Sequence, residues 1–214
     1  QIFAKLKIAL GSVEAVFGYL ESLLTQTDED LIEKSTIVLI KHSNTSEQVV
    51  RQALVVMQTS GNGTVRSALA RELATLLKAN QVSWDARLQG EMVDALKFLA
   101  GYDADNSVRR AAIDAIGQLK CDNSTDFLAS IVRSKKGIGE STPDWSVAVS
   151  CLARSGEVDA GRALARICSE LPTESDVLQT IVYGVKCNIH HFERFPNEIK
   201  ISLGDGAKTV LEKF

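Results

Sequence analysis

Apolar residues recur at intervals of three and four along nearly the whole chain. In residues 106–119 they fall at i, i+3, i+4, i+7, i+8 and i+11, which places them in one stripe along an α-helix. Similar stripes occur in 65–77, 88–99 and 178–185. No segment alternates apolar and polar residues with the sustained period of two that a half-buried strand requires. The pattern therefore predicts an all-α fold.

Capping and helix-breaking residues separate these stripes. Thr142-Pro143 places a capping residue before a proline at the expected first helical position. Gly61, Gly101 and Gly156 fall at expected helix ends. The predicted helices cover residues 2–24 (with a break near Gly11), 28–43, 46–60, 63–79, 84–100, 105–119, 123–134, 143–155, 157–171 and 174–191, with a short tail helix near 205–213. Their boundaries carry an uncertainty of about 2–4 residues.

One octapeptide pattern repeats along the chain. Residues 62–69 (Asn-Gly-Thr-Val-Arg-Ser-Ala-Leu) match residues 105–112 (Asp-Asn-Ser-Val-Arg-Arg-Ala-Ala) after 43 positions, and residues 144–147 (Asp-Trp-Ser-Val) match the opening again after 39. Helix pairs at this spacing are typical of α-solenoids. With the Val-Arg-x-Ala element, the pattern resembles the HEAT/armadillo repeat family. The resemblance is clearest over residues 46–171.

This resemblance implies an α/α superhelix of about five helix pairs, forming a single domain over residues 1–214 with an irregular C-terminal cap at 192–214. It further implies that Val65, Val108 and Val147 anchor the second helix of each pair in the core. Arg66 and Arg109 match a polar ladder between neighbouring repeats, which Ala148 interrupts in the third repeat. Because the chain begins with Gln1 rather than Met, we expect either a removed leader or a fragment of a longer chain.

Stacked helix pairs leave a long curved polar surface, which suits recognition of another protein or a peptide. The expected function is therefore that of a non-catalytic scaffold or adaptor that binds its partner on the concave face. Polar residues off the apolar stripes of the two matched helices are the partner-binding candidates: Arg66, Ser67, Arg71, Arg110, Asp114 and Gln118. The competing interpretation of each residue is an ordinary solvated helix face.

Charge and composition argue against several other classes. The net charge is −3, whereas nucleic-acid binders usually carry a basic excess. No apolar run is long enough for a membrane-spanning helix. The four cysteines form no C-x-x-C pair, and Cys187 with His190 and His191 lacks a second ligand pair for zinc. We therefore expect no catalytic residues, cofactor or metal, and the sequence does not predict an oligomeric state.

Three alternatives come from other classes. Trp84-Asp85 and Asp144-Trp145 resemble the Trp and Asp of HEAT-like DNA alkylpurine glycosylases, although the chain is acidic and poor in aromatics. Helical-repeat lyases that attach bilin pigments share only the repeat. Three Asn-x-Ser/Thr sequons, at Asn44, Asn62 and Asn123, would instead suit a secreted helical horseshoe that carries lipid. Because Asn, Ser and Thr also cap helices, we favour capping and a cytoplasmic location.

Overall fold

The computed structural model describes residues 5, 8, 12–23, 28–42, 46–79, 85–119, 123–134, 143–170, 176–187, 197, 199–201 and 204. Every regular element in this described part is an α-helix, and none of its residues lies in a strand. The all-α prediction is therefore confirmed for these residues. The chain divides into two compact units, Gln1–Ala95 and Leu96–Phe214.

The first unit contains α2 (Val13–Leu23), α3 (Glu29–His42), α4 (Glu47–Thr59) and α5 (Gly63–Ala79). Helix α3 packs against α2, α4 and α5, and α4 also packs against α5. Capping side chains set two of the helix starts: Asp28 Oδ1 accepts a hydrogen bond from Leu31 N–H at 3.2 Å, and Ser46 Oγ accepts one from Val49 N–H at 3.4 Å.

Helix α6 (Ala86–Tyr102) runs from the end of the first unit into the second. Its predicted apolar stripe is buried throughout, at Leu88, Met92, Ala95, Leu96 and Leu99. The helix continues through Gly101, which was expected to end it.

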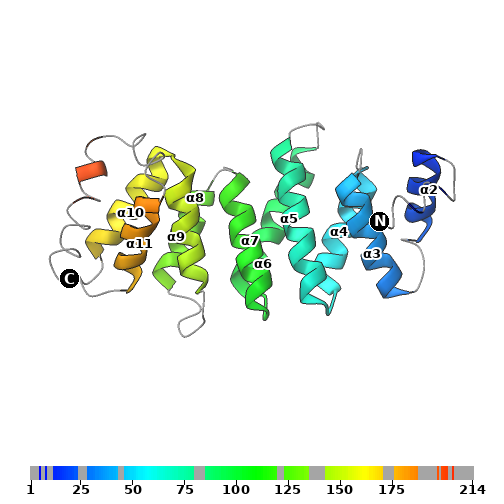
Figure 1. Cartoon of the computed structure of the whole chain (residues 1–214), viewed down its shortest axis with the longest axis horizontal. Coiled ribbons are helices and arrows are strands. Elements are labelled where there is room, and N and C mark those ends of the chain that lie inside the picture. Colours follow the sequence, from blue (N-terminus) through cyan, green and yellow to red (C-terminus); the bar gives the residue numbers. More distant parts are fainter. Residues whose placement is uncertain are drawn as a thin grey trace. The chain divides into compact units, whose positions relative to one another are not determined.

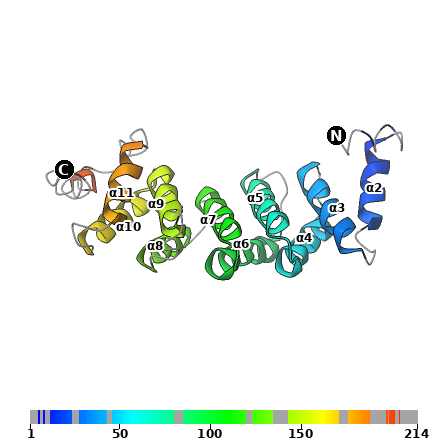
Figure 2. The ribbon, with the colours of Figure 1, turned by 60° about the horizontal axis from the view of Figure 1, so that its bottom comes forward.

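The second unit contains α7 (Asn106–Leu119), α8 (Ser124–Ser134), α9 (Asp144–Ser155), α10 (Val158–Glu170) and α11 (Asp176–Cys187). Helices α7, α9 and α11 pack side by side in one layer, and α8 and α10 pack together in the other (Figures 1 and 2). Helix α9 contacts the other four helices, so it forms the centre of this unit. Gly156 ends α9 with a left-handed φ of 69°, as the sequence predicts for a helix end.

Small residues let the helices of the second unit approach closely. The predicted stripe of α7 is buried at Val108, Ala111, Ala112, Ala115 and Ile116.

No helix in the described part has the length and apolar character needed to cross a membrane. The predicted tail helix at 205–213 and the break near Gly11 lie outside the described residues, and the predicted cap at 192–214 lies mostly outside them. The superhelix and its single domain stay predictions.

Candidate functional site

The turn before α5 is closed by a set of local hydrogen bonds. Ser60 Oγ accepts from Asn62 N–H at 3.0 Å, and Asn62 Oδ1 accepts from Thr64 N–H at 3.0 Å. Arg66 then reaches back and donates from Nη1 to the Ser60 carbonyl oxygen at 2.7 Å. The side chains thus satisfy polar groups at the helix start that the helix itself cannot.

The same set recurs before α7, 43 residues along the chain. Asp103 Oδ1 accepts from Asp105 N–H at 2.9 Å, and Asp105 Oδ1 accepts from Ser107 N–H at 2.8 Å. Arg109 donates from Nη1 to the Asp103 carbonyl oxygen at 3.0 Å and to that of Ala104 at 3.2 Å. The repeat in the sequence is therefore also a repeat of local geometry.

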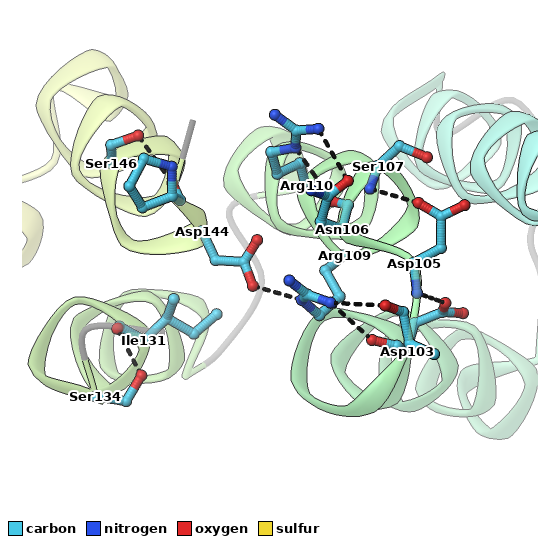
Figure 3. Close-up of polar contacts among 12 residues, drawn as sticks. Asp103, Asp105, Asn106, Ser107, Arg109, Arg110, Ile131, Ser134, Asp144 and Ser146 are labelled. Carbon is cyan, nitrogen blue, oxygen red and sulfur yellow. Dashed lines mark hydrogen bonds and ion pairs between the residues drawn. The ribbon is translucent and has the colours of Figure 1, made fainter. Parts of the chain in front are cut away.

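Arg109 makes one further contact, which links two helices of the second unit. Its Nε lies 2.6 Å from Oδ2 of Asp144, the first residue of α9 (Figure 3). The two side chains are only 8% and 0% exposed. Arg109 thus makes a polar contact between two helices of this unit, and the ladder between repeats that the resemblance implies for it stays a prediction. The pair favours one register of α7 against α9, because any other register would leave a buried charge without its counter-charge, which costs free energy.

The start of α9 differs from the predicted alignment by one residue. The sequence match aligned Asp144 with the capping residues of the earlier repeats, but Pro143 occupies the N-cap position and makes no side-chain cap hydrogen bond. The buried stripe of α9 runs through Trp145, Ala148, Val149 and Leu152, and Val147 lies beside it and is half-buried. The prediction that Val147 anchors this helix in the core is therefore wrong.

Three of the predicted partner-binding residues lie together on α7. Arg110, Asp114 and Gln118 recur every fourth residue; Gln118 is exposed and the other two are half-buried. Gln118 Nε2 donates to Asp114 Oδ2 at 2.8 Å. Across the helix boundary, Arg154 of α9 donates to Asp114 Oδ1 at 2.6 Å. The result is a polar row on α7 that extends onto α9.

Arg110 is held within this row by its own helix. Its Nε donates to the Asn106 carbonyl oxygen and its Nη2 to Asn106 Oδ1, both at 3.2 Å (Figure 3). Arg154 was not among the predicted candidates. Its charge complements Asp114 forty residues earlier, at the spacing of the repeat, and this signal could have identified it.

The other three candidates belong to α5 of the first unit. Arg71 is exposed, whereas Arg66 is half-buried and bonded to the turn before its helix. Ser67 is only 5% exposed, and no described group reaches its Oγ within hydrogen-bond distance. Its placement on the exposed face is therefore wrong: the stripe is wide enough here for a small polar residue to be buried beside Val65 and Leu69.

Helices α7 and α9 approach each other closely at Gly117 and Cys151. A Cβ atom added to Gly117 would lie 2.5 Å from Sγ of Cys151 and 2.6 Å from its Cβ. Burial raises the pKa of the Cys151 thiol to about 12, and the nearby Asp114 carboxylate acts in the same direction. The thiol is therefore protonated at neutral pH and packs as a small apolar group.

The described residues contain no group of three or more His, Cys, Asp or Glu side chains placed to hold a metal ion. One polar concavity of about 380 Å³ lies between the start of α8 and α10. Its charged lining residues are Asp126, Asp159, Arg162 and Arg166. Because these charges cancel, the concavity favours neither an anion nor a cation.

No protein-family model matches the chain, and no curated protein matches it either. Among solved structures, the crystal structure of an engineered protein is similar at 17% sequence identity, over 90% of this chain and 72% of that chain, with a TM-score of 0.29. A likeness this loose assigns neither a fold nor a function.

Proposed function

We propose that the chain is a non-catalytic scaffold or adaptor that binds another protein or a peptide. In this proposal its helices form five successive HEAT-type pairs, α2/α3, α4/α5, α6/α7, α8/α9 and α10/α11, stacked as an α/α superhelix. The binding surface is the polar row on α7 and α9, which consists of Arg110, Asp114, Gln118 and Arg154.

The observation that carries the proposal is the buried bond between Arg109 and Asp144. It joins the second helix of one pair to the second helix of the next, and it lies one residue from Arg110. A surface held in one geometry loses less conformational entropy when a partner binds. The repeated turn hydrogen bonds at Ser60 and Asp103 support the same interpretation, because they occur at the spacing of a repeat.

The composition of the row suits a polar partner surface. Arg is enriched at energetically important interface positions. Asp114 and Arg154 are 40% and 48% exposed in their ion pair, so a partner reaches both charges without first breaking a buried contact. The row offers donors and acceptors together, which fits a peptide backbone or a polar loop better than an apolar ligand.

Site-specific photocrosslinking tests this proposal. A benzophenone amino acid replaces Gln118 in one variant and the exposed Arg166 of α10 in another, and both are expressed in the protein's native cells. We expect a discrete crosslinked protein from position 118 and none from 166. Arg110→Glu should remove that crosslink, whereas Arg166→Glu, with the same change of charge, should leave it intact.

The proposal fails if position 118 gives no discrete product, or if positions 118 and 166 capture the same proteins equally. It also fails if both charge-reversal variants weaken the crosslink to the same extent. Circular dichroism of each variant controls for loss of the helical fold.

A further inference from the structure

The turn before α5 contains Asn62 and Gly63, the one place in this sequence where glycine follows asparagine. An asparagine side chain is open to attack by the backbone nitrogen of the residue that follows it. Glycine opposes this attack least, because it has no Cβ. Asn62 is exposed, so water and hydroxide reach its carboxamide. The turn therefore combines the two residue types and the solvent access that spontaneous loss of the amide requires.

The start of α5 leaves the reacting groups available. Gly63 is the first residue of this helix, and the N–H groups of a first helical turn have no acceptor within the helix. Thr64 N–H donates to Asn62 Oδ1 at 3.0 Å, which polarises the carboxamide and makes its carbon more electrophilic. The positive end of the helix dipole also stabilises the negative charge that develops on this oxygen during attack. The hydrogen bond that closes the turn thus activates the side chain.

The equivalent turn in the second unit shows that an aspartate fits at position 62. Forty-three residues later, Asp105 stands in the place of Asn62. Asp105 Oδ1 accepts from Ser107 N–H at 2.8 Å, which is the bond that Asn62 Oδ1 makes before α5 (Figure 3). A carboxylate therefore closes this turn as well as a carboxamide does.

The backbone does not require glycine at position 63. The equivalent residue in the second unit is Asn106. Among the described glycines, Gly156 is the one with a left-handed φ, so Gly63 has a backbone conformation that other residues adopt. A Cβ atom at position 63 would therefore hinder the approach of the backbone nitrogen to the side chain without straining the backbone of the turn.

We propose that Asn62 is a site of spontaneous deamidation in the folded chain. The backbone nitrogen of Gly63 gives up its proton to the solvent and attacks Cγ of Asn62. The N–Cγ bond forms, and the Cγ–Nδ2 bond breaks as the nitrogen takes up a proton and leaves as ammonia. The resulting five-membered imide adds one water molecule, which opens it to aspartate or to isoaspartate. No electrons are transferred, and water is the co-reactant.

The two products differ in their effect on the start of α5. Aspartate reproduces the turn before α7, and its negative charge is favourable at a helix N-terminus. Isoaspartate carries the main chain through Cγ, which adds a methylene group to the backbone and removes the oxygen that accepts from Thr64 N–H. The modification therefore supports or disrupts the helix start according to which imide bond water opens.

Peptide mass spectrometry of the full chain measures the reaction. The chain is made in bacteria, so that the sequon at Asn62 carries no glycan, and it is incubated at neutral pH and digested at mildly acidic pH. We expect the peptide with Asn62 to gain the mass of an amide-to-acid change faster than those with Asn106 or Asn123, which precede serine. Raising the pH by about one unit should speed the reaction about tenfold, because attack requires loss of the Gly63 amide proton.

Two glycine variants test the geometry. Gly63→Ala should slow the reaction at Asn62 about tenfold, which corresponds to a barrier higher by about 1.4 kcal/mol. The matched control Gly90→Ala, at an exposed position of α6, should leave the rate unchanged. Asn62→Asp represents the first product, and its melting temperature in circular dichroism should equal or exceed that of the unchanged chain, because the turn keeps its hydrogen bond.

Three results would overturn the proposal. One is no mass change in the folded chain over a period in which the urea-unfolded chain reacts. The second is an equal rate at Asn62, Asn106 and Asn123, and the third is an unchanged rate in Gly63→Ala. A lower melting temperature of Asn62→Asp would overturn the equivalence of the two turns. None of these measurements depends on the crosslink at position 118, so the proposed function and this modification stand or fall separately.

Discussion

Removing one partner of the buried Arg109–Asp144 pair should destabilise the second unit strongly. Loss of one side of a buried ion pair typically costs about 3–5 kcal/mol, because an uncompensated charge stays behind. The two single substitutions should differ within that range. After Asp144→Ala, Arg109 keeps its hydrogen bonds to the carbonyl oxygens of Asp103 and Ala104, so we expect the free energy of unfolding to fall by about 3 kcal/mol.

Arg109→Leu should lower the free energy of unfolding further, by about 5 kcal/mol. It leaves a carboxylate that is 0% exposed, and it also removes the donor to both carbonyl oxygens. The double variant Arg109→Met with Asp144→Leu buries no charge. It loses mainly hydrogen bonds to two part-buried carbonyls, for a cost of about 2 kcal/mol.

Urea denaturation followed by Trp145 fluorescence measures these changes. Trp145 is 7% exposed and adjoins Asp144, so its emission reports on this unit. Replacing Trp84 with Phe makes it the only indole. The exposed pair Arg133–Glu170, at 41% and 47% exposure, is the control, and Arg133→Leu should cost under about 1 kcal/mol. The reasoning is refuted if Arg109→Leu costs no more than this control, or if the double variant is less stable than both singles.

Three further predictions concern the contact between α7 and α9. Gly117→Ala should lower the free energy of unfolding by about 1–3 kcal/mol, since its methyl group would overlap Cys151. Gly90→Ala, in open space on α6, should raise the free energy of unfolding by up to about 1 kcal/mol. Equal effects of the two substitutions in thermal unfolding would contradict the close approach at Gly117. Because burial raises the pKa of the Cys151 thiol to about 12 from an ordinary 9, its contribution to stability is complete below pH 9 and declines as the pH rises towards 12. The Cys151→Ala variant should lack this part of the alkaline decline in urea titrations. At pH 8 Cys151 should also be alkylated by iodoacetamide more slowly than Cys168, whose pKa is raised to about 11, and faster labelling of Cys151 in mass spectra would count against the assignment.

Helix periodicity was sufficient to predict the all-α class of the described part and most of its core. The stripe in 88–99 is buried at all five predicted positions. It also places Phe98 and Tyr102 off the buried side, so their exposure follows from the same pattern. Periodicity succeeds here because the burial of a residue in packed helices depends mainly on its angle around the helix axis.

The details of the site could be predicted less well from the sequence, because they depend on the exact position of each residue along its helix and on contacts with neighbouring helices. Asp144 resembled a capping residue, but it is the first residue of α9 and its carboxylate pairs with Arg109 of α7, which the sequence does not indicate. Ser67 resembled a surface residue because a serine carries no strong burial signal. Arg154 pairs with Asp114 on a different helix, and a single helix wheel contains no information on that pairing.

Arg109 and Arg110 show how one helix can separate a structural role from the recognition role that we propose. The two residues are identical and adjacent, so composition and propensity treat them alike. A rotation of 100° per residue directs Arg109 into the α7–α9 interface, where its charge is neutralised, and leaves Arg110 half-buried beside Asn106 on the open side. A buried arginine costs desolvation energy that a hydrophobic pair would avoid, and the hydrogen bonds of Arg109 to the carbonyl oxygens of Asp103 and Ala104 offset that cost. The register of α7 against α9 determines where Arg110, Asp114 and Arg154 stand relative to one another, and the proposed recognition depends on that spacing.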